Sequence, residues 1–248
     1  MRKGWATATL VTVSLGLAPA LSAAQQQPPQ RAPAPSPQQE AAPAYKPPLR
    51  GAPGGRVGGA TRGTVKPVTA LPTVDLIAPD AHTGLTTSAT PILYFYVSGR
   101  VSYPTRLTIS VPMQPAPIIE ANIPSPQAAG IYAIRLGDYR VRLGPGVVYT
   151  WSVSIILNPS APSRDIVASA SLLRVPSDPG LDATTRAAPL VRRAALFAEA
   201  GLWYDAVAAA NEAAALDRHA ALDALINEVG LVAVAGSGRQ TAPGAGSR

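Results

Sequence analysis

Between Leu71 and Val175, hydrophobic and polar residues alternate in short runs that are separated by prolines and glycines. The clearest run is residues 147–157, where large apolar side chains occupy every second position and Thr150 and Ser152 stand between them. A period of two is typical of a β-strand with one buried face. The pattern predicts strands at residues 73–77, 92–97, 106–111, 118–123, 131–136, 147–157 and 166–175.

The connections between these runs are too short to hold crossover helices, so neighbouring strands should run antiparallel. Short strands at this spacing predict an antiparallel, immunoglobulin-like β-sandwich over residues 71–176. In the run 92–97 both faces are apolar. We therefore expect this strand to be central in its sheet and covered on both sides.

After the last predicted strand, the hydrophobic residues recur at helical spacing. One helix should begin near Pro189 and end at Gly201, because proline suits the first turn and glycine the left-handed closing position. A second should cover residues 203–216, and Asp217 should cap a third. The predicted fold class is mainly β with a C-terminal α part, in which a helical hairpin within residues 177–235 packs on the sandwich.

The turn of this hairpin resembles the second half of a tetratricopeptide repeat, where a glycine, an aromatic ring and several alanines let two helices pack closely. The residues that carry this resemblance are Gly201, Trp203, Ala206, Ala213, Leu216 and Asp217. Only one such unit is visible, so we expect a hairpin docked on a sheet, with a peptide-binding array as the alternative. Trp151, Phe197 and Trp203 should lie in one interior shared by sheets and helices.

The first residues have the layout of a secretory signal peptide, with two basic residues, an apolar run and small residues before Gln25. We expect residues 1–24 to direct export, to the periplasm or outside the cell, and to be removed. An uncleaved membrane anchor is the alternative, but polar residues interrupt a run that is short for a span. No second apolar run of that length follows, so no transmembrane segment is predicted in the mature chain. Residues 25–70 and 236–248 have the composition of a disordered linker and tail.

The formal net charge of +7 is confined to one end of the chain. Residues 1–66 hold eight basic residues and one acidic residue, whereas residues 67–248 hold thirteen of each. The predicted folded part is therefore neutral and gives no reason to expect nucleic-acid binding. The basic arm suits an anionic cell surface or polymer, and a solvated linker is the alternative.

No residue pattern indicates catalysis, a cofactor or a metal. The chain has no cysteine, and His82 and His219 stand far apart in sequence. Phosphate-binding loops and nucleophile elbows are absent from the sequence. We therefore expect no enzymatic activity, no cofactor and no metal site.

Two groups of side chains are candidates for a ligand or partner surface. Tyr94 and Tyr96 share one face of their predicted strand and could offer a shelf to sugar rings, although core packing explains them as well. Arg135, Arg140 and Arg142 could form an anion-binding patch, or they could pair with exposed carboxylates along a strand edge.

Five motifs follow one another along the chain. They are Gly55-Arg56-Val57-Gly58-Gly59-Ala60-Thr61-Arg62-Gly63, Pro91 followed by Tyr94-Phe95-Tyr96-Val97, Gly130-Ile131-Tyr132, Tyr149-x-Trp151, and Arg193-Ala194-Ala195-Leu196-Phe197-Ala198-Glu199-Ala200-Gly201-Leu202-Trp203-Tyr204-Asp205-Ala206. Together they resemble the bacterial exported family catalogued as domain of unknown function 928. This resemblance implies an exported protein without an assigned activity, and it carries no catalytic residue over.

We therefore expect a non-enzymatic interaction or scaffold module of the cell envelope, with an envelope protein as its partner. The alternative is a binding module for an anionic cell-wall polymer or glycan, which would use the basic arm and the face of Tyr94 and Tyr96.

Overall fold

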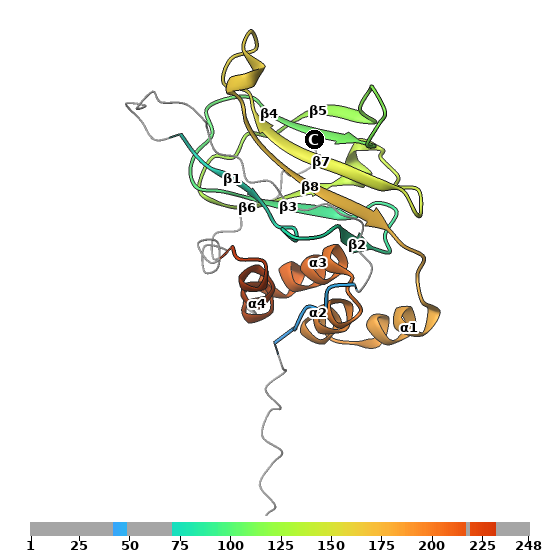
Figure 1. Cartoon of the computed structure of the whole chain (residues 1–248). Helices are drawn as coiled ribbons and strands as arrows, with labels where there is room; N and C mark the ends of the chain where they lie inside the picture. Colours follow the sequence, from blue (N-terminus) through green and yellow to red (C-terminus); the bar gives the residue numbers. More distant parts are fainter. Residues whose placement is uncertain (1–41, 49–70, 217–218, 232–248) are drawn as a thin grey trace, which may run out of the picture. The chain divides into compact units, whose positions relative to one another are not determined.

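The computed structural model describes residues 42–48, 71–216 and 219–231. In these ranges the chain forms two β-sheets followed by four α-helices (Figure 1), which confirms the expected mainly β chain with a C-terminal α part. The strands are β1 (Val74–Leu76), β2 (Gly84–Thr86), β3 (Ile92–Val97), β4 (Thr105–Ser110), β5 (Ile119–Ile123), β6 (Gly130–Arg135), β7 (Val148–Ile155) and β8 (Ile166–Arg174). The helices are α1 (Pro179–Ala187), α2 (Leu190–Glu199), α3 (Trp203–Ala214) and α4 (Ala220–Glu228), besides the 3-10 helices Leu136–Tyr139 and Pro162–Arg164.

One sheet has three strands in the order β1-β3-β6, and the other has five in the order β2-β8-β7-β4-β5. The seven predicted strands are all present, with ends that differ by at most two residues. The sequence does not predict β2, because three residues are too few to show an alternation. β2 pairs with β8 in parallel, so the expectation of a wholly antiparallel fold is wrong at this one pair.

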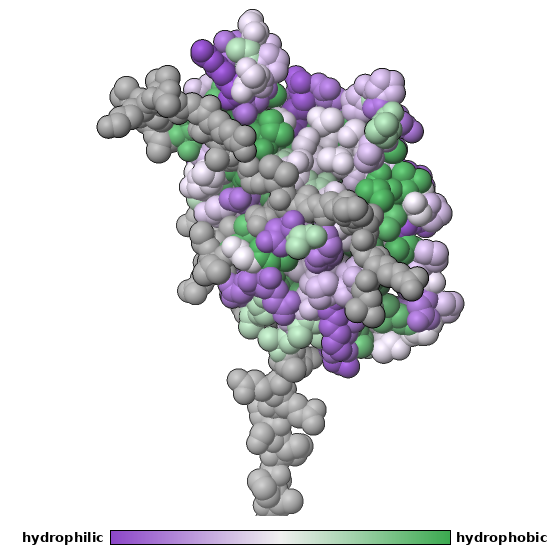
Figure 2. Space-filling model, in the orientation of Figure 1, coloured by the Kyte–Doolittle hydropathy of each residue, from purple (hydrophilic) through white to green (hydrophobic). Residues whose placement is uncertain are grey.

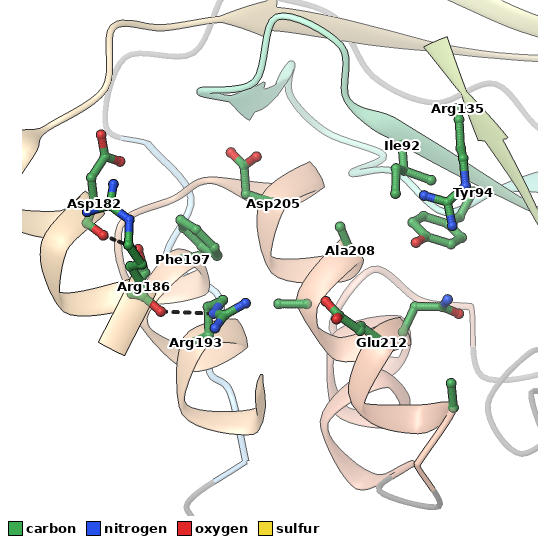
Figure 3. A pocket seen from close by; sticks show the side chains of 14 residues that line it. Ile92, Tyr94, Arg135, Asp182, Arg186, Arg193, Phe197, Asp205, Ala208 and Glu212 are labelled. Atoms are coloured by element: carbon green, nitrogen blue, oxygen red, sulfur yellow. Dashed lines mark hydrogen bonds between the residues drawn. The ribbon is translucent and has the colours of Figure 1, made fainter. Parts of the chain in front are cut away.

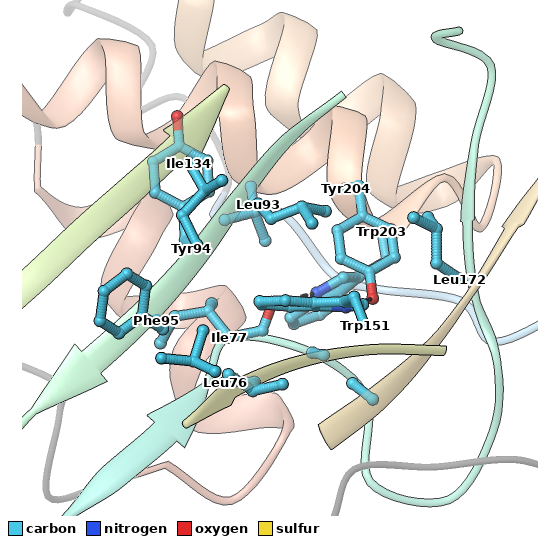
Figure 4. Packing of buried hydrophobic residues seen from close by; sticks show 14 of the residues in the cluster. Leu76, Ile77, Leu93, Tyr94, Phe95, Ile134, Trp151, Leu172, Trp203 and Tyr204 are labelled. Atoms are coloured by element: carbon cyan, nitrogen blue, oxygen red, sulfur yellow. Dashed lines mark hydrogen bonds between the residues drawn. The ribbon is translucent and has the colours of Figure 1, made fainter. Parts of the chain in front are cut away.

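The two sheets enclose a hydrophobic core, and β7 shows how the sequence builds it. Side chains along β7 alternate between half-buried and buried, as a period of two predicts. Trp151 of β7 belongs to the same buried cluster as Leu93 and Phe95 from the other sheet (Figure 4). At the start of the strand, the Tyr149 hydroxyl accepts a hydrogen bond from the N–H of Gly144 at 2.8 Å, which fixes the turn before β7.

The helices form a layer next to the three-stranded sheet, and α3 contacts both β2 and β3 (Figure 1). β3 is the middle strand of its sheet, with Leu93 and Phe95 buried on one face and Tyr94 buried on the other. The expectation that this strand is central and covered on both sides is confirmed. Figure 2 shows hydrophilic side chains beside pale, weakly hydrophobic ones over the helical layer, as expected for alanine-rich helices with charged outer residues.

Two aromatic side chains connect the first turn of α3 to the β-sheet part of the chain, and we call this contact the joint. The Trp203 Nε1–H donates to the carbonyl oxygen of Ile77 at 3.0 Å. The Tyr204 hydroxyl accepts from Trp151 Nε1–H at 2.9 Å and donates to the carbonyl oxygen of Ser171 at 3.1 Å. Tyr204 therefore connects α3 to both β7 and β8 with its polar atom fully satisfied.

The expectation that three rings share the interior is correct for two of them. Trp151 and Trp203 are each 0% exposed. Phe197 is only half-buried, so its predicted place inside the core is wrong. It lies on the side of α2 that lines a groove beside α1 and α3.

The helix boundaries follow local signals. Gly201 has φ +74° and closes the turn between α2 and α3, as predicted. Helix α1 is not among the predicted elements, although Asp178 caps it by accepting from the Gly180 N–H at 2.8 Å and Pro179 stands in its first turn. Asp217, the predicted cap of the last helix, lies outside the described residues.

Residues 42–48 belong to the stretch 25–70 for which the sequence predicts a disordered linker. These seven residues instead run without a turn or bend against α2, α3 and α4, where hydrogen bonds hold them. The predicted signal peptide, the rest of that linker and the predicted tail lie outside the described residues. Within the described ranges, no helix is both long and apolar enough to cross a bilayer.

Candidate functional site

A groove of about 820 Å³ lies where the helical layer meets β3 and β6 (Figure 3). α1, α2 and α3 supply most of its walls, and the strands contribute Ile92, Tyr94 and Arg135. We call it the arginine groove. Its charged lining residues are Arg135, Asp182, Arg186, Arg193, Asp205 and Glu212.

Two of the three arginines have no ion-pair partner among the described residues. Arg135 reaches the groove from the end of β6 and Arg186 from α1, and both residues are exposed. In the part of the chain that the structure describes, neither guanidinium lies within 4.0 Å of a carboxylate oxygen or donates a hydrogen bond. As far as residues 42–48, 71–216 and 219–231 are concerned, their donors can therefore bind an anionic group.

The third arginine is held in place by backbone carbonyls. Arg193 on α2 donates from Nε to the carbonyl oxygen of Thr185 at 2.9 Å and from Nη2 to that of Ala188 at 3.2 Å. Both carbonyls stand at the C-terminal end of α1, where helix carbonyls lack partners within the helix. Arg193 thus joins α1 to α2, and in Figure 3 its guanidinium faces Glu212 across the groove.

Asp205 lines the groove but turns its carboxylate toward the loop after β2. It accepts from the N–H of Thr87 at 2.8 Å and from the Thr86 hydroxyl at 3.0 Å. The residue as a whole keeps some exposure, but its carboxyl group is buried, and this burial raises the pKa of Asp205 to about 6. The hydrogen bonds from Thr87 and Thr86 oppose the rise in pKa, whereas the charge of Asp182 adds to it. Asp205 is therefore a structural link between α3 and the β2 loop, and its pKa of about 6 lies above the ordinary value of an aspartate.

Tyr94 and Phe197 give the groove an apolar part. Tyr94 is 4% exposed and extends its hydroxyl toward α3, whereas Phe197 is half-buried. Burial raises the pKa of Tyr94 to about 12. The charge of Arg135 and a hydrogen bond with Asn211 oppose this rise in pKa, and the charge of Glu212 adds to it. The phenol is accordingly neutral at physiological pH and can donate or accept a hydrogen bond.

The structure brings together only two of the five candidate residues from the sequence. Tyr94 and Arg135 line the groove. Tyr96 lies half-buried on the same strand outside its lining. Arg140 and Arg142 are exposed, and neither belongs to the lining. The arginine patch that the sequence suggests is thus divided between the groove and another part of the surface.

Sequence reasoning missed Arg186, Arg193 and the acidic residues of the groove. One signal for them exists on α3, where Asp205, Ala208 and Glu212 recur at helical spacing along one face. Acidic residues that recur on one face of an alanine-rich helix indicate a face turned away from the hydrophobic core. The arginines carry no comparable signal, since they reach the groove from three different elements.

The described residues contain no cluster of three or more histidine or acidic side chains able to hold a metal. Neither the curated proteins nor the solved structures gave a match to this chain. A family model described as Domain of Unknown Function (DUF928) matches residues 57–237, which is more than half of the chain. This range includes all the strands and helices of the structure. The chain therefore belongs to the DUF928 family.

Proposed function

We propose that this protein is a non-enzymatic binding module of the cell envelope, and that its arginine groove holds a carboxylate-bearing glycan. The observation that carries this proposal is the pair Arg135 and Arg186, which face the groove without an ion pair in the described part of the chain. A guanidinium presents parallel N–H donors that match the two oxygens of a carboxylate. Two such groups on one groove favour a ligand with repeated acidic units.

The other lining residues favour a sugar over a simpler anion. Asp182 and Glu212 are acceptors, so they complement the hydroxyl donors of a sugar ring. Phe197 and the ring of Tyr94 offer apolar surface against which the C–H face of a sugar can pack. A polyphosphate has no such donors and no apolar face, and should bind less well.

Export and the basic arm belong to the same proposal. The apolar leader and the excess of basic residues in residues 1–66 favour a protein that meets anionic polymers outside the cytoplasm. The arm would add electrostatic attraction that does not depend on the shape of the ligand. A scaffold that binds an acidic segment of an envelope protein is the competing function, since the same arginines would serve it.

The test is binding of the full mature chain to polygalacturonate, with neutral dextran and polyphosphate for comparison. We expect Arg135→Gln with Arg186→Gln to weaken polygalacturonate binding by about tenfold or more, because two charge-assisted contacts are lost. The matched control is Arg100→Gln with Arg164→Gln, which removes the same charge from exposed positions outside the groove. Equal losses in the two double variants would contradict the proposal.

A further comparison separates the groove from the arm. Replacing Arg50, Arg56, Arg62 and Lys66 by Gln removes four positive charges of the arm that the groove does not need. If this arm variant abolishes binding and the groove variant does not, the arm alone is responsible and the groove has no part in it.

We also infer that the sandwich has immunoglobulin-like topology and that the hairpin packs like half a tetratricopeptide repeat. The first supporting feature is the strand order, with β1 in one sheet and β2 beside β8 in the other. The second is the Tyr149 hydroxyl at the turn before β7, which resembles the tyrosine corner of such domains. For the hairpin, the support is Gly201 in the turn, with Trp203 and the facing alanines buried.

A further inference from the structure

Residues 42–48, which we call the strap, lie against a site formed by His82, Ala198, Gly201, Trp203 and Glu228, which we call the cradle. The strap's backbone makes two hydrogen bonds to it. The Lys46 N–H donates to the carbonyl oxygen of Ala198 at 3.0 Å, and the Tyr45 N–H donates to Oε2 of Glu228 at 2.7 Å. From Pro43 to Pro48 only three residues carry an N–H, so most of the strap's donors in this range serve the cradle.

The Tyr45 side chain is the centre of the contact. Its ring packs edge-on against Trp203, with centroids 4.8 Å apart, and lies parallel to the His82 ring at 5.6 Å. Its hydroxyl and Nε2 of His82 share a hydrogen bond of 2.7 Å. Burial, and next the charge of Glu228, raise the pKa of Tyr45, which keeps the phenol neutral.

A glycine in the cradle accepts the backbone of the strap. Gly201 has φ +74°, and a Cβ there would lie 3.0 Å from the carbonyl oxygen of Lys46. Gly230 has φ +73° and no atom within 4 Å of its would-be Cβ. Both glycines therefore have a positive φ, but only at Gly201 does the backbone of the strap lie close to the position of a Cβ.

We infer that the cradle is a binding site for extended Tyr-Lys-Pro-Pro peptides, and that the strap is its resident ligand, bound within the same chain. The contacts are those of peptide recognition: backbone hydrogen bonds give the direction and one aromatic side chain gives the anchor. The prolines beside Tyr45 and Lys46 restrict the free peptide to extended conformations, which lowers the entropy lost on binding.

The strap packs on the core through Tyr45 but lies outside the strands and helices of the fold. It contributes no strand and no helix. The hydrogen bond from Trp203 to Ile77 involves no residue of the strap. The site also shares no residue with the arginine groove, so this inference does not depend on the proposed function.

Attachment to the chain explains why a short peptide can occupy the cradle. The strap and β1 are joined by the same polypeptide, so its effective concentration at the cradle is on the order of millimolar. A free peptide of the same sequence must compete with this occupant. Once the strap is weakened, the free peptide should bind.

The experiment uses the full mature chain and a fluorescent peptide of residues 40–50, followed by anisotropy. We expect Tyr45→Ala protein to bind the peptide roughly tenfold or more tightly than wild type, because its own strap no longer competes. A peptide with alanine in place of its tyrosine should not bind. Within the Tyr45→Ala protein, adding Gly201→Ala should weaken peptide binding, whereas adding Gly230→Ala should not.

Each other outcome overturns the inference. If Tyr45→Ala protein is unfolded by circular dichroism, the strap belongs to the core. If it is folded and binds the peptide no better than wild type, the cradle is not a peptide site. If wild type forms dimers that Tyr45→Ala abolishes, the strap is exchanged between copies and the assignment to the same chain is wrong.

Discussion

The joint and the arginine groove share helix α3 but differ in how their polar groups are satisfied. At the joint, both indole N–H groups and the Tyr204 hydroxyl have protein partners and the rings are buried. In the groove, Arg135 and Arg186 are exposed and lack an ion pair in the described part of the chain. A fully satisfied polar cluster stabilises the fold, whereas free donors beside a groove are available for a ligand. Helix α3 thus contributes to two regions with different roles.

The largest expected effect is at the joint. Trp203→Ala should lower the free energy of unfolding by about 3–5 kcal/mol, because it leaves a cavity and removes the donor to Ile77. Trp203→Phe keeps much of the volume and should cost clearly less. Urea unfolding measures both, and equal losses would mean that the volume of the ring contributes little.

The next effect concerns the space that the Tyr204 ring needs. A Cβ at Gly84 would lie 2.6 Å from a ring carbon of Tyr204, so Gly84→Ala should destabilise the fold by about 1–3 kcal/mol. At Gly99 no atom lies within 4 Å of such a Cβ, and Gly99→Ala is the matched control. Similar unfolding midpoints for the two variants would show that the joint is loosely packed.

A smaller effect comes from Asp205, which lies between the two regions. Its pKa rises from 3.8 to about 6 on folding, so the folded state binds the proton more tightly. The resulting stabilisation is complete below the ordinary pKa and is lost as the pH rises through about 6. With the residue's partial exposure taken into account, the loss between pH 4 and 7 should be about 1–2 kcal/mol.

Asp205→Asn provides the test, because its amide oxygen can still accept from the Thr87 N–H while carrying no charge. The difference in unfolding free energy between wild type and Asp205→Asn should fall over this pH range. His82 also makes the stability depend on pH, with the opposite sign, because burial lowers its pKa. This contribution is the same in wild type and in Asp205→Asn, so it cancels in the difference between their unfolding free energies. A difference that stays constant with pH would show that the Asp205 carboxyl is solvated.

The smallest effect on stability is expected in the groove itself. Arg135→Gln with Arg186→Gln should change the unfolding free energy by no more than about 0.5 kcal/mol, since both residues are exposed and unpaired in the described part. A loss comparable to that at the joint would mean that these arginines stabilise the fold, and the contrast between the two regions would disappear.

The contrast also explains what could be predicted from the sequence. Strands such as β7 and the turn at Gly201 follow from spacing within one segment, so local patterns are sufficient to place them. Helical spacing identifies the apolar face that holds Phe197 without saying which neighbour covers it, so the sequence predicts this ring inside the core although it is half-buried. β2 has only three residues, and it forms a strand because it pairs with β8, which lies more than 80 residues away in the sequence.

The groove and the strap could not be predicted from local sequence patterns, for a related reason. The groove collects residues from two strands and three helices, and no single segment shows its chemistry. The strap lies in a proline-rich stretch whose composition indicates disorder, because such a stretch cannot form a core of its own. One tyrosine and two backbone hydrogen bonds hold it on a core that the rest of the chain has built.

The most direct test of the central claim is an NMR titration that follows the arginine side-chain Nε–Hε signals of the mature protein with galacturonate oligomers. We predict that the signals of Arg135 and Arg186 shift with a common binding curve, while those of Arg100 and Arg164 stay unchanged. Shifts confined to arginines of the N-terminal arm, or spread equally over all exposed arginines, would contradict a binding site in the groove.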